Sequence, residues 1–214
     1  MKIEWIGHAC FKLTAQDGTV VITDPYDESV GIDMIPLKAD LITMSHAHHD
    51  HCEESMIVGN PVIVRGAQKA CVGSVESEAV LSWHDDAVGQ LRGENAIRIF
   101  TIDGLKVVHM GDQGCMPDEA ALEKITGADV MMIPVGGTYT VDARGAKAII
   151  DRAKPACVIP MHVKTKRCPY PIAAMSEALS ALGAADAKPC DVIEMKKSDV
   201  PCGVLLMQPM ADTL

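Results

Sequence analysis

Apolar residues in the first half of the chain form short runs that stop at turn-forming residues. Residues 10–15 and 19–23 flank Asp17-Gly18, a dipeptide that favours tight two-residue turns, so this pattern predicts a pair of antiparallel strands. The same pattern returns at residues 96–102 and 105–109, which flank Asp103-Gly104. Three other short apolar runs predict further strands, at residues 40–44, 61–64 and 79–83.

Strands alternate with helices in the second half of the chain. Strands are predicted at residues 130–134 and 157–161, and helices at residues 117–125, 142–154 and 172–182. The first of these helices opens with proline and two acidic residues, which is typical of a helix N-terminus. Two shorter helices are predicted at residues 52–59 and 67–73, and two strands are expected near the C-terminus. This order predicts an α/β protein in which two mixed sheets pack face to face, with helices on their outer faces.

Length and charge narrow the class of protein. A chain of 214 residues fits one domain, and we treat residues 1–214 as a single domain. The net charge of −10 argues against a basic surface that binds nucleic acid. No apolar run approaches the roughly 20 residues that span a bilayer, and the first residues, which include Glu4, lack the pattern of a secretion signal. Eight scattered cysteines without a Cys-x-x-Cys pair are typical of reduced thiols, so we expect a cytoplasmic protein.

Four histidines and one aspartate lie within residues 46–51, directly after an apolar run. His46, His48, Asp50 and His51 have the form His-x-His-x-Asp-His. His46 and His48 are two positions apart in an extended segment, so their side chains point the same way and can share one metal ion. Asp50 and His51 follow a turn and can face a neighbouring ion. Imidazole with carboxylate suits zinc, with manganese or iron as alternatives.

Two structural explanations compete with this interpretation. Asp50 could cap a helix, with Glu53 completing a pattern similar to a capping box, and the whole cluster could be a surface tract that binds metal adventitiously. Three further candidate ligands argue against the second explanation. Each of them follows a strand-like run, so all could project from one rim of the sheets: His84, Asp112 and His162.

Taken in order, these motifs resemble the metal motifs of the metallo-β-lactamase superfamily. The nearer similarity is to its bacterial metal-dependent hydrolases, the branch that includes ascorbate-6-phosphate lactonase-like proteins. The segments that carry the resemblance span residues 1–165 and are Gly7-His8, Thr23-Asp24-Pro25 and residues 43–51, 82–84, 109–112 and 158–162.

The resemblance implies a fold, a ligand set and two divalent metal ions. The fold would be an αββα sandwich with the site at one edge of the two sheets. The first metal would be held by His46, His48 and His84, and the second by Asp50, His51 and His162. Asp112 would bridge the two, and Asp24 would lie beneath the cluster and orient its ligands.

A pair of metals implies hydrolysis by a bridging hydroxide, which Asp50 would orient or deprotonate. His109 could reach the substrate or stabilise the loop of Asp112, and His8 could donate a hydrogen bond to a ligand carboxylate or to a backbone carbonyl. For substrate binding we single out three cations close to His162 and one tyrosine after a strand, namely Lys164, Lys166, Arg167 and Tyr139. The cations could hold an anion such as a sugar phosphate or belong to a solvated loop, and the segment of the tyrosine could line the pocket or form a plain turn.

The predicted function is therefore hydrolysis of a small anionic ester or lactone. The alternatives are a phosphodiesterase, of nuclease or phospholipase type, and a non-catalytic metal-binding protein. A di-iron redox protein is disfavoured because such relatives carry a carboxylate where this chain has His48. The short stretch before His84 indicates that a loop covering the substrate is missing or is supplied by another subunit, which leaves a homo-oligomer open.

Overall fold

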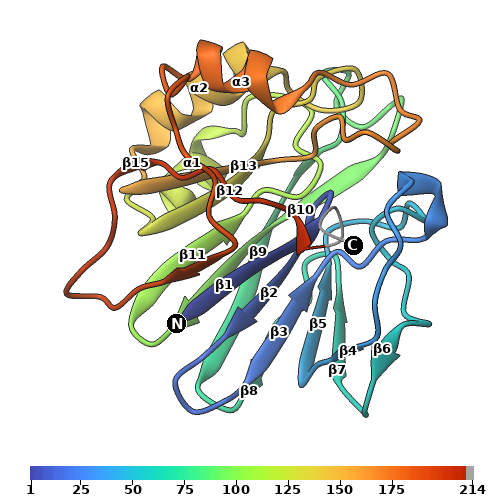
Figure 1. Cartoon of the computed structure of the whole chain (residues 1–214), viewed down its shortest axis with the longest axis vertical. Coiled ribbons are helices and arrows are strands. Elements are labelled where there is room, and N and C mark those ends of the chain that lie inside the picture. Colours follow the sequence, from blue (N-terminus) through green and yellow to red (C-terminus); the bar gives the residue numbers. More distant parts are fainter. Residues whose placement is uncertain (211–214) are drawn as a thin grey trace.

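Two large mixed β-sheets form the body of the protein in the computed structural model, which describes residues 1–210 (Figure 1). The first sheet has the strand order β14 (Val192–Glu194), β1 (Lys2–Gly7), β2 (Cys10–Thr14), β3 (Val20–Thr23), β5 (Leu41–Met44) and β7 (Val62–Arg65). The second has the order β15 (Gly203–Val204), β13 (Cys157–Met161), β12 (Val130–Pro134), β11 (Leu105–His109), β10 (Glu94–Ile102), β9 (Val75–Trp83) and β8 (Ala70–Val72). A small third sheet pairs β4 (Leu37–Lys38) with β6 (Ile57–Val58).

Each large sheet combines antiparallel and parallel pairs. In the first sheet β1, β2 and β3 are antiparallel, whereas β3, β5 and β7 run parallel. In the second, β8 to β11 are antiparallel and β11, β12, β13 and β15 run parallel. Both predicted Asp-Gly hairpins are present, as β2–β3 and β10–β11. The parallel halves place several strand ends at one rim of the two sheets.

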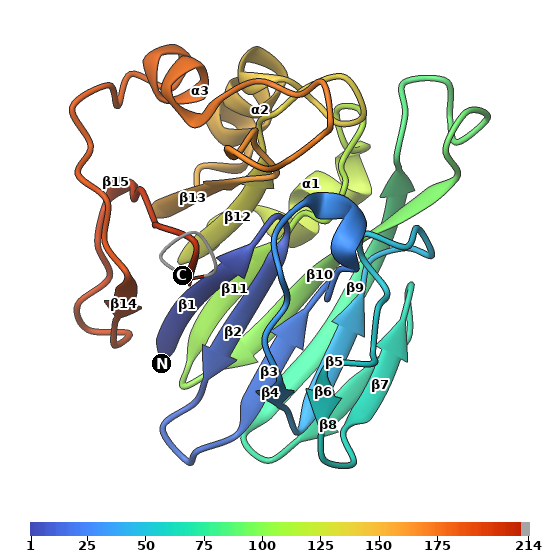
Figure 2. The same ribbon diagram turned by 45° about the vertical axis from the view of Figure 1, so that its right-hand side comes forward.

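The three α-helices of residues 1–210 lie on the outer face of the second sheet, as Figures 1 and 2 show. They are α1 (Glu119–Ile125), α2 (Ala143–Ala153) and α3 (Met175–Ala181). Asp118 and Asp142 cap α1 and α2 by accepting backbone N–H groups, which stabilises the first turn of each helix. On the outer face of the first sheet the described chain has the small third sheet and the 3-10 turn η1 (Glu28–Val30). The predicted class of two mixed sheets packed face to face is confirmed, but among residues 1–210 the α-helices cover one outer face rather than both. None of the helices in residues 1–210 has the length and apolar character that crossing a bilayer requires.

The main core lies between the two large sheets. Trp5 and Phe11 from the first sheet are stacked with ring centroids 6.1 Å apart, and both are buried. Phe100, Val107 and Met131 from the second sheet belong to the same cluster and are fully buried. Burial of each large apolar side chain contributes about 1.5–3 kcal/mol, so this layer holds the two sheets in one arrangement.

Two short helices predicted from the sequence are wrong. Residues 52–59 form a turn followed by β6, and their backbone is held by distant groups: Glu53 N–H donates to the Pro25 carbonyl, and Leu37 N–H donates to the Met56 carbonyl. Residues 67–73 contain β8, which turns at Gly73 and pairs with β9. Because no helix follows it, Asp50 caps none.

Candidate metal centre

The predicted ligands converge because each follows a strand that ends at the same rim. Residues 45–51 follow β5, whereas His84, Asp112 and His162 come after β9, β11 and β13. Three residues at this rim have positive φ, namely His8 (52°), Asp24 (39°) and His162 (55°). Non-glycine residues adopt this conformation at a cost, and such strain is concentrated at functional sites.

Three histidines form the first group of candidate ligands. Ligand atoms of His46, His48 and His84 lie within 4.8 Å of one another. Their ring centroids are 4.7 Å apart for His46 and His48, 4.7 Å for His46 and His84, and 5.0 Å for His48 and His84. This is the set that the resemblance assigns to the first metal.

The second group contains Asp50, His51 and His162, again with ligand atoms within 4.8 Å of one another. The structure adds His8 to this group. The Nε2 atom of His8 lies 3.4 Å from Oδ2 of Asp50, and its ring centroid lies 4.1 Å from that of His162. His8 therefore contacts two candidate ligands directly.

Asp112 lies between the two groups. Its Oδ2 atom is 3.2 Å from Nε2 of His84 and 3.3 Å from Nε2 of His162, while Oδ1 is 3.2 Å from Nε2 of His51. One carboxylate thus faces histidines of both groups, which is the placement that a bridging ligand needs.

The loop that carries Asp112 is fixed by close packing. The backbone N–H of Asp112 donates to Oδ1 of Asn95 at 2.9 Å. The preceding Gly111 has φ of 56°, and a Cβ there would lie 2.3 Å from the same Asn95 oxygen and 2.6 Å from Cβ of Ser45. Only glycine fits this position without displacing its neighbours.

Asp24 lies behind the cluster and is 1% exposed. Its Oδ1 accepts the N–H of Ser45 at 2.8 Å, and its Oδ2 accepts the Ser45 hydroxyl at 2.5 Å and lies 2.9 Å from Nδ1 of His51. The same hydroxyl lies 2.9 Å from Nδ1 of His46. Nδ1 of both histidines is therefore engaged, while Nε2 of His46 has no hydrogen-bond partner among residues 1–210 and Nε2 of His51 faces Asp112 at 3.2 Å. Orienting partners of this kind are a regular feature of metal sites.

The charges of the cluster fit a bound cation. Burial lowers the pKa of His46 to about 3 and that of His8 to about 4, so both keep a lone pair at neutral pH. Burial alone would lower the pKa of His51, but Asp112 and Asp24 raise it well above its usual value. Burial would also raise the pKa of Asp112, yet His162 and His51 hold it well below its usual range. The carboxylates thus require positive charge nearby, and these imidazole and carboxylate donors suit divalent zinc.

A cavity of about 330 Å³ opens above these ligands. Its volume is at the small end of the range for small-molecule sites. It is lined by His48, His49, Asp50, His84, Arg92, Asp112, Tyr139, His162 and Tyr170. Tyr139 was singled out from the sequence, whereas Arg92 and Tyr170 were missed. No local motif marks these two residues, because they approach the site only through loop contacts.

The three cations after His162 do not line this cavity. Lys164 and Lys166 line a separate hollow that also involves Trp5. The Nζ atom of Lys164 donates to the Tyr170 carbonyl at 2.7 Å, and Arg167 donates two hydrogen bonds to the Asp33 carboxylate at 2.8 and 3.0 Å. In the structure Lys164 and Arg167 hold their own loop and attach it to the loop after η1.

His109 lies away from the cavity and is buried. Its Nε2 atom is 2.8 Å from the Ala9 carbonyl, and its Nδ1 accepts the N–H of Gly111 at 3.2 Å. Both ring nitrogens therefore contact backbone, which corresponds to the loop-stabilising alternative rather than to contact with substrate.

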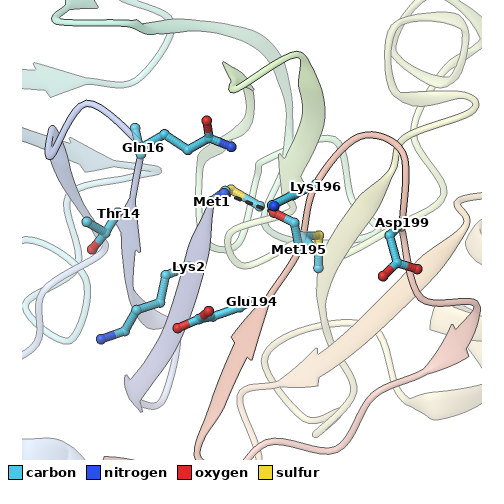
Figure 3. Close-up of a pocket in the computed structure, with 9 residues that line it drawn as sticks. Met1, Lys2, Thr14, Gln16, Glu194, Met195, Lys196 and Asp199 are labelled. Carbon is cyan, nitrogen blue, oxygen red and sulfur yellow. Dashed lines mark hydrogen bonds between the residues drawn. The ribbon is translucent and has the colours of Figure 1, made fainter.

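A larger hollow lies elsewhere on the protein and carries different chemistry. Figure 3 shows its lining between β1 and β14, with the ionisable side chains Lys2, Glu194, Lys196 and Asp199. No histidine or cysteine lines it. Within residues 1–210, the groups of side chains that could hold a metal all lie at the strand-end rim.

Comparison with known proteins identifies the family of this chain. Residues 2–162 match the family model described as "Beta-lactamase superfamily domain". The chain is 32% identical over 191 residues to a UPF0173 metal-dependent hydrolase from Thermoplasma acidophilum, with 77% of this chain and 84% of the relative covered. It is 31% identical over 184 residues to a UPF0173 protein from Pyrococcus furiosus, with the same coverage. The fold is similar to the crystal structure of a candidate zinc-dependent hydrolase of the metallo-β-lactamase superfamily from Thermotoga maritima, with a TM-score of 0.80. The two chains are 30% identical, and the match covers 96% of this chain and 97% of that chain.

Proposed function

Since the chain belongs to the UPF0173 metal-dependent hydrolases of the metallo-β-lactamase superfamily, we propose that it binds two divalent metal ions, zinc in the first instance, and hydrolyses a small anionic ester or lactone. The position of Asp112 carries the two-metal part of this proposal. Its two carboxylate oxygens face histidines of both groups, at 3.2 to 3.3 Å from their Nε2 atoms. The lactone preference comes from the resemblance to ascorbate-6-phosphate lactonase-like proteins.

The first ion would be held by His46, His48 and His84, and the second by Asp50, His51 and His162. When bound, paired divalent ions lower the pKa of water from 15.7 to about 7 and so supply hydroxide at neutral pH. Asp50 would orient that water or accept its proton. Burial would raise its pKa, but the contact with His8 and the charge of His51 lower it, so Asp50 is a carboxylate at neutral pH.

The cavity volume supports a small substrate, and the free cysteines support a cytoplasmic location. The cavity of about 330 Å³ admits a small molecule rather than a polymer strand. All eight cysteines are free thiols, which supports a reducing, cytoplasmic location.

A metal-content measurement combined with a substrate panel tests this proposal. We expect two metal ions per chain after loading with zinc, and hydrolysis of at least one member of a panel of anionic esters and lactones. Bis-p-nitrophenyl phosphate tests the phosphodiesterase alternative, since a two-metal core also supports attack on phosphorus. Activity on this diester alone would replace our first choice.

Variants distinguish an enzyme from a metal-binding protein without activity. His48→Ala removes an exposed candidate ligand of the first group, so the fold should persist while hydrolysis is lost. Circular dichroism checks the fold. Glu123→Ala, on the exposed side of α1, is a control that should behave like the unaltered protein. Metal binding without hydrolysis of any panel member would leave the non-catalytic alternative.

A further inference from the structure

We propose that Arg92 and Tyr139 form the subsite that binds the negatively charged group of the substrate, next to the metal centre. This inference rests on the proposed function, because it assumes that the substrate reacts at the metals. It identifies the substrate as a short ester or lactone with a carboxylate at the end remote from the scissile bond.

Arg92 reaches the cavity from the connection between β9 and β10, which extends beyond the strand ends in Figure 2. Its Cζ atom lies 5.6 Å from the centroid of the Tyr139 ring, a distance typical of cation–π contact. One of its terminal nitrogens lies 3.4 Å from the Thr138 carbonyl. Arg92 and Tyr139 line the same cavity as the candidate ligands His84 and Asp112.

The loop that presents Arg92 is held in one conformation by Asp85. This buried carboxylate accepts four backbone N–H groups, at 2.8 Å from Ala87, 2.9 Å from Gly89, 3.0 Å from Leu91 and 2.7 Å from Arg92. Burial would raise the pKa of Asp85, but these backbone donors lower it. The Asp85 carboxylate is therefore engaged with backbone N–H groups and forms no ion pair with the guanidinium of Arg92.

Arg92 differs in its partners from three other arginines of the chain. Arg65, Arg152 and Arg167 each form an ion pair with a carboxylate. Arg92 forms none with any carboxylate within residues 1–210, although it is only partly exposed. A guanidinium held by a ring and a carbonyl keeps most of its donors available, and its planar arrangement of donors matches a carboxylate.

Two tyrosines give the cavity an aromatic wall. The rings of Tyr139 and Tyr170 meet edge to face, with centroids 5.9 Å apart and an interplanar angle of 77°. The Tyr170 hydroxyl is held 2.8 Å from the hydroxyl of Ser29. With the metal ligands on one side and Arg92 beside this wall, the cavity suits a short acyl chain with a terminal negative charge.

Steady-state kinetics of the zinc-loaded protein with two matched esters test the subsite. The anionic ester is p-nitrophenyl hydrogen glutarate, and the neutral one of equal acyl length is p-nitrophenyl valerate. Arg92→Ala should raise KM for the anionic ester by about 10- to 100-fold, as loss of a hydrogen-bonded charge pair predicts, and change KM for the neutral ester less than about threefold. Arg92→Lys, which keeps the charge but loses the planar fork, should fall between.

Arg152→Ala is the matched control, because it removes one positive charge from the exposed side of α2. It should leave both KM values unchanged. An equal rise of KM for both esters in Arg92→Ala would overturn the inference. So would a selective rise in Lys166→Ala instead of Arg92→Ala, since that result would assign the anion to the segment after His162.

Calorimetric titration of glutarate into the zinc-loaded protein separates this inference from the proposed function. Arg92→Ala should bind glutarate at least about tenfold more weakly than the unaltered protein and Arg152→Ala. If neither ester is hydrolysed, the proposed ester hydrolysis fails, and the glutarate titration still decides the subsite. Equal glutarate affinity in all three proteins would overturn it.

Discussion

Replacement of Asp24 by asparagine should weaken metal binding although Asp24 itself belongs to neither ligand group that we assign to the two metals. In the structure Oδ2 of Asp24 accepts from Ser45 and faces Nδ1 of His51 at 2.9 Å, which holds a ring proton on Nδ1, so that Nε2 is the nitrogen that can give up its proton and bind metal. An amide nitrogen at this position would donate to Nδ1 and move the ring proton to Nε2. His51 would then lose the lone pair that binds metal.

Rotation of the amide does not relieve this conflict. It would place the amide nitrogen against the N–H of Ser45, which now donates to Oδ1 of Asp24 at 2.8 Å. Two buried donors would then face each other. Loss of an orienting partner costs about 10- to 100-fold in metal affinity, which corresponds to about 1.4–2.7 kcal/mol.

Competition with a fluorescent zinc chelator measures this change as a ratio of dissociation constants. Asp33→Asn is the control, because it removes the same charge from an exposed residue whose partner is Arg167. Circular dichroism of the metal-free proteins shows whether the fold is retained. Zinc affinity of a folded Asp24→Asn protein within twofold of the unaltered protein would refute the assignment of Asp24 as the group that orients His51.

Three further predictions concern the loops and the metals. Gly111→Ala should destabilise the protein by about 2 kcal/mol or more, because the residue has positive φ and a Cβ would meet Asn95. Urea unfolding measures this loss of stability. Gly104→Ala separates the cost of positive φ from that of the clash, because Gly104 also has positive φ but a Cβ there meets no atom within 4 Å. Asp85→Ala should raise KM for the anionic ester while zinc content stays unchanged, since four backbone donors of the loop that presents Arg92 lose their acceptor. An unchanged KM would show that this loop is rigid without the Asp85 carboxylate. Chelation of the metal should lower the unfolding temperature and abolish hydrolysis, because zinc at 100 times its Kd stabilises the folded state by about 2.7 kcal/mol. Readdition of zinc should restore the unfolding temperature and the hydrolysis. Equal unfolding temperatures of the zinc-loaded and metal-free proteins would contradict a metal site formed by folding.

The strands could be predicted because their signals are local. Alternating and apolar runs bounded by turn dipeptides gave both Asp-Gly hairpins and the strands that end at the ligand rim. The two helices that failed lie where distant pairing decides the backbone. Residues 57–58 pair with residues 37–38, and residues 70–72 turn at Gly73 to pair with β9. Short segments of mixed composition leave the choice between strand and helix to such contacts.

The candidate ligands could be recognised for a related reason. His46, His48, Asp50 and His51 are close in sequence, and their spacing alone predicts that they share a site. Assignment of His84, Asp112 and His162 needed the resemblance as well, because a strand end does not reveal which other strand ends lie beside it. The parallel pairing of β3 with β5 and of β11 with β12 and β13 supplies that information in the structure.

The sequence by itself identified the candidate metal ligands of residues 46–51, since closely spaced imidazole and carboxylate side chains are donors that suit divalent metals. The tertiary structure alone decided which positive charge lines the cavity above the candidate ligands. Lys164 and Arg167, close to His162 in sequence, turn to the Tyr170 carbonyl and to Asp33, whereas Arg92, seventy residues earlier than His162, lines the cavity. The direction of a long cationic side chain depends on the partners that surrounding loops offer, and those partners come from parts of the chain that only folding brings together.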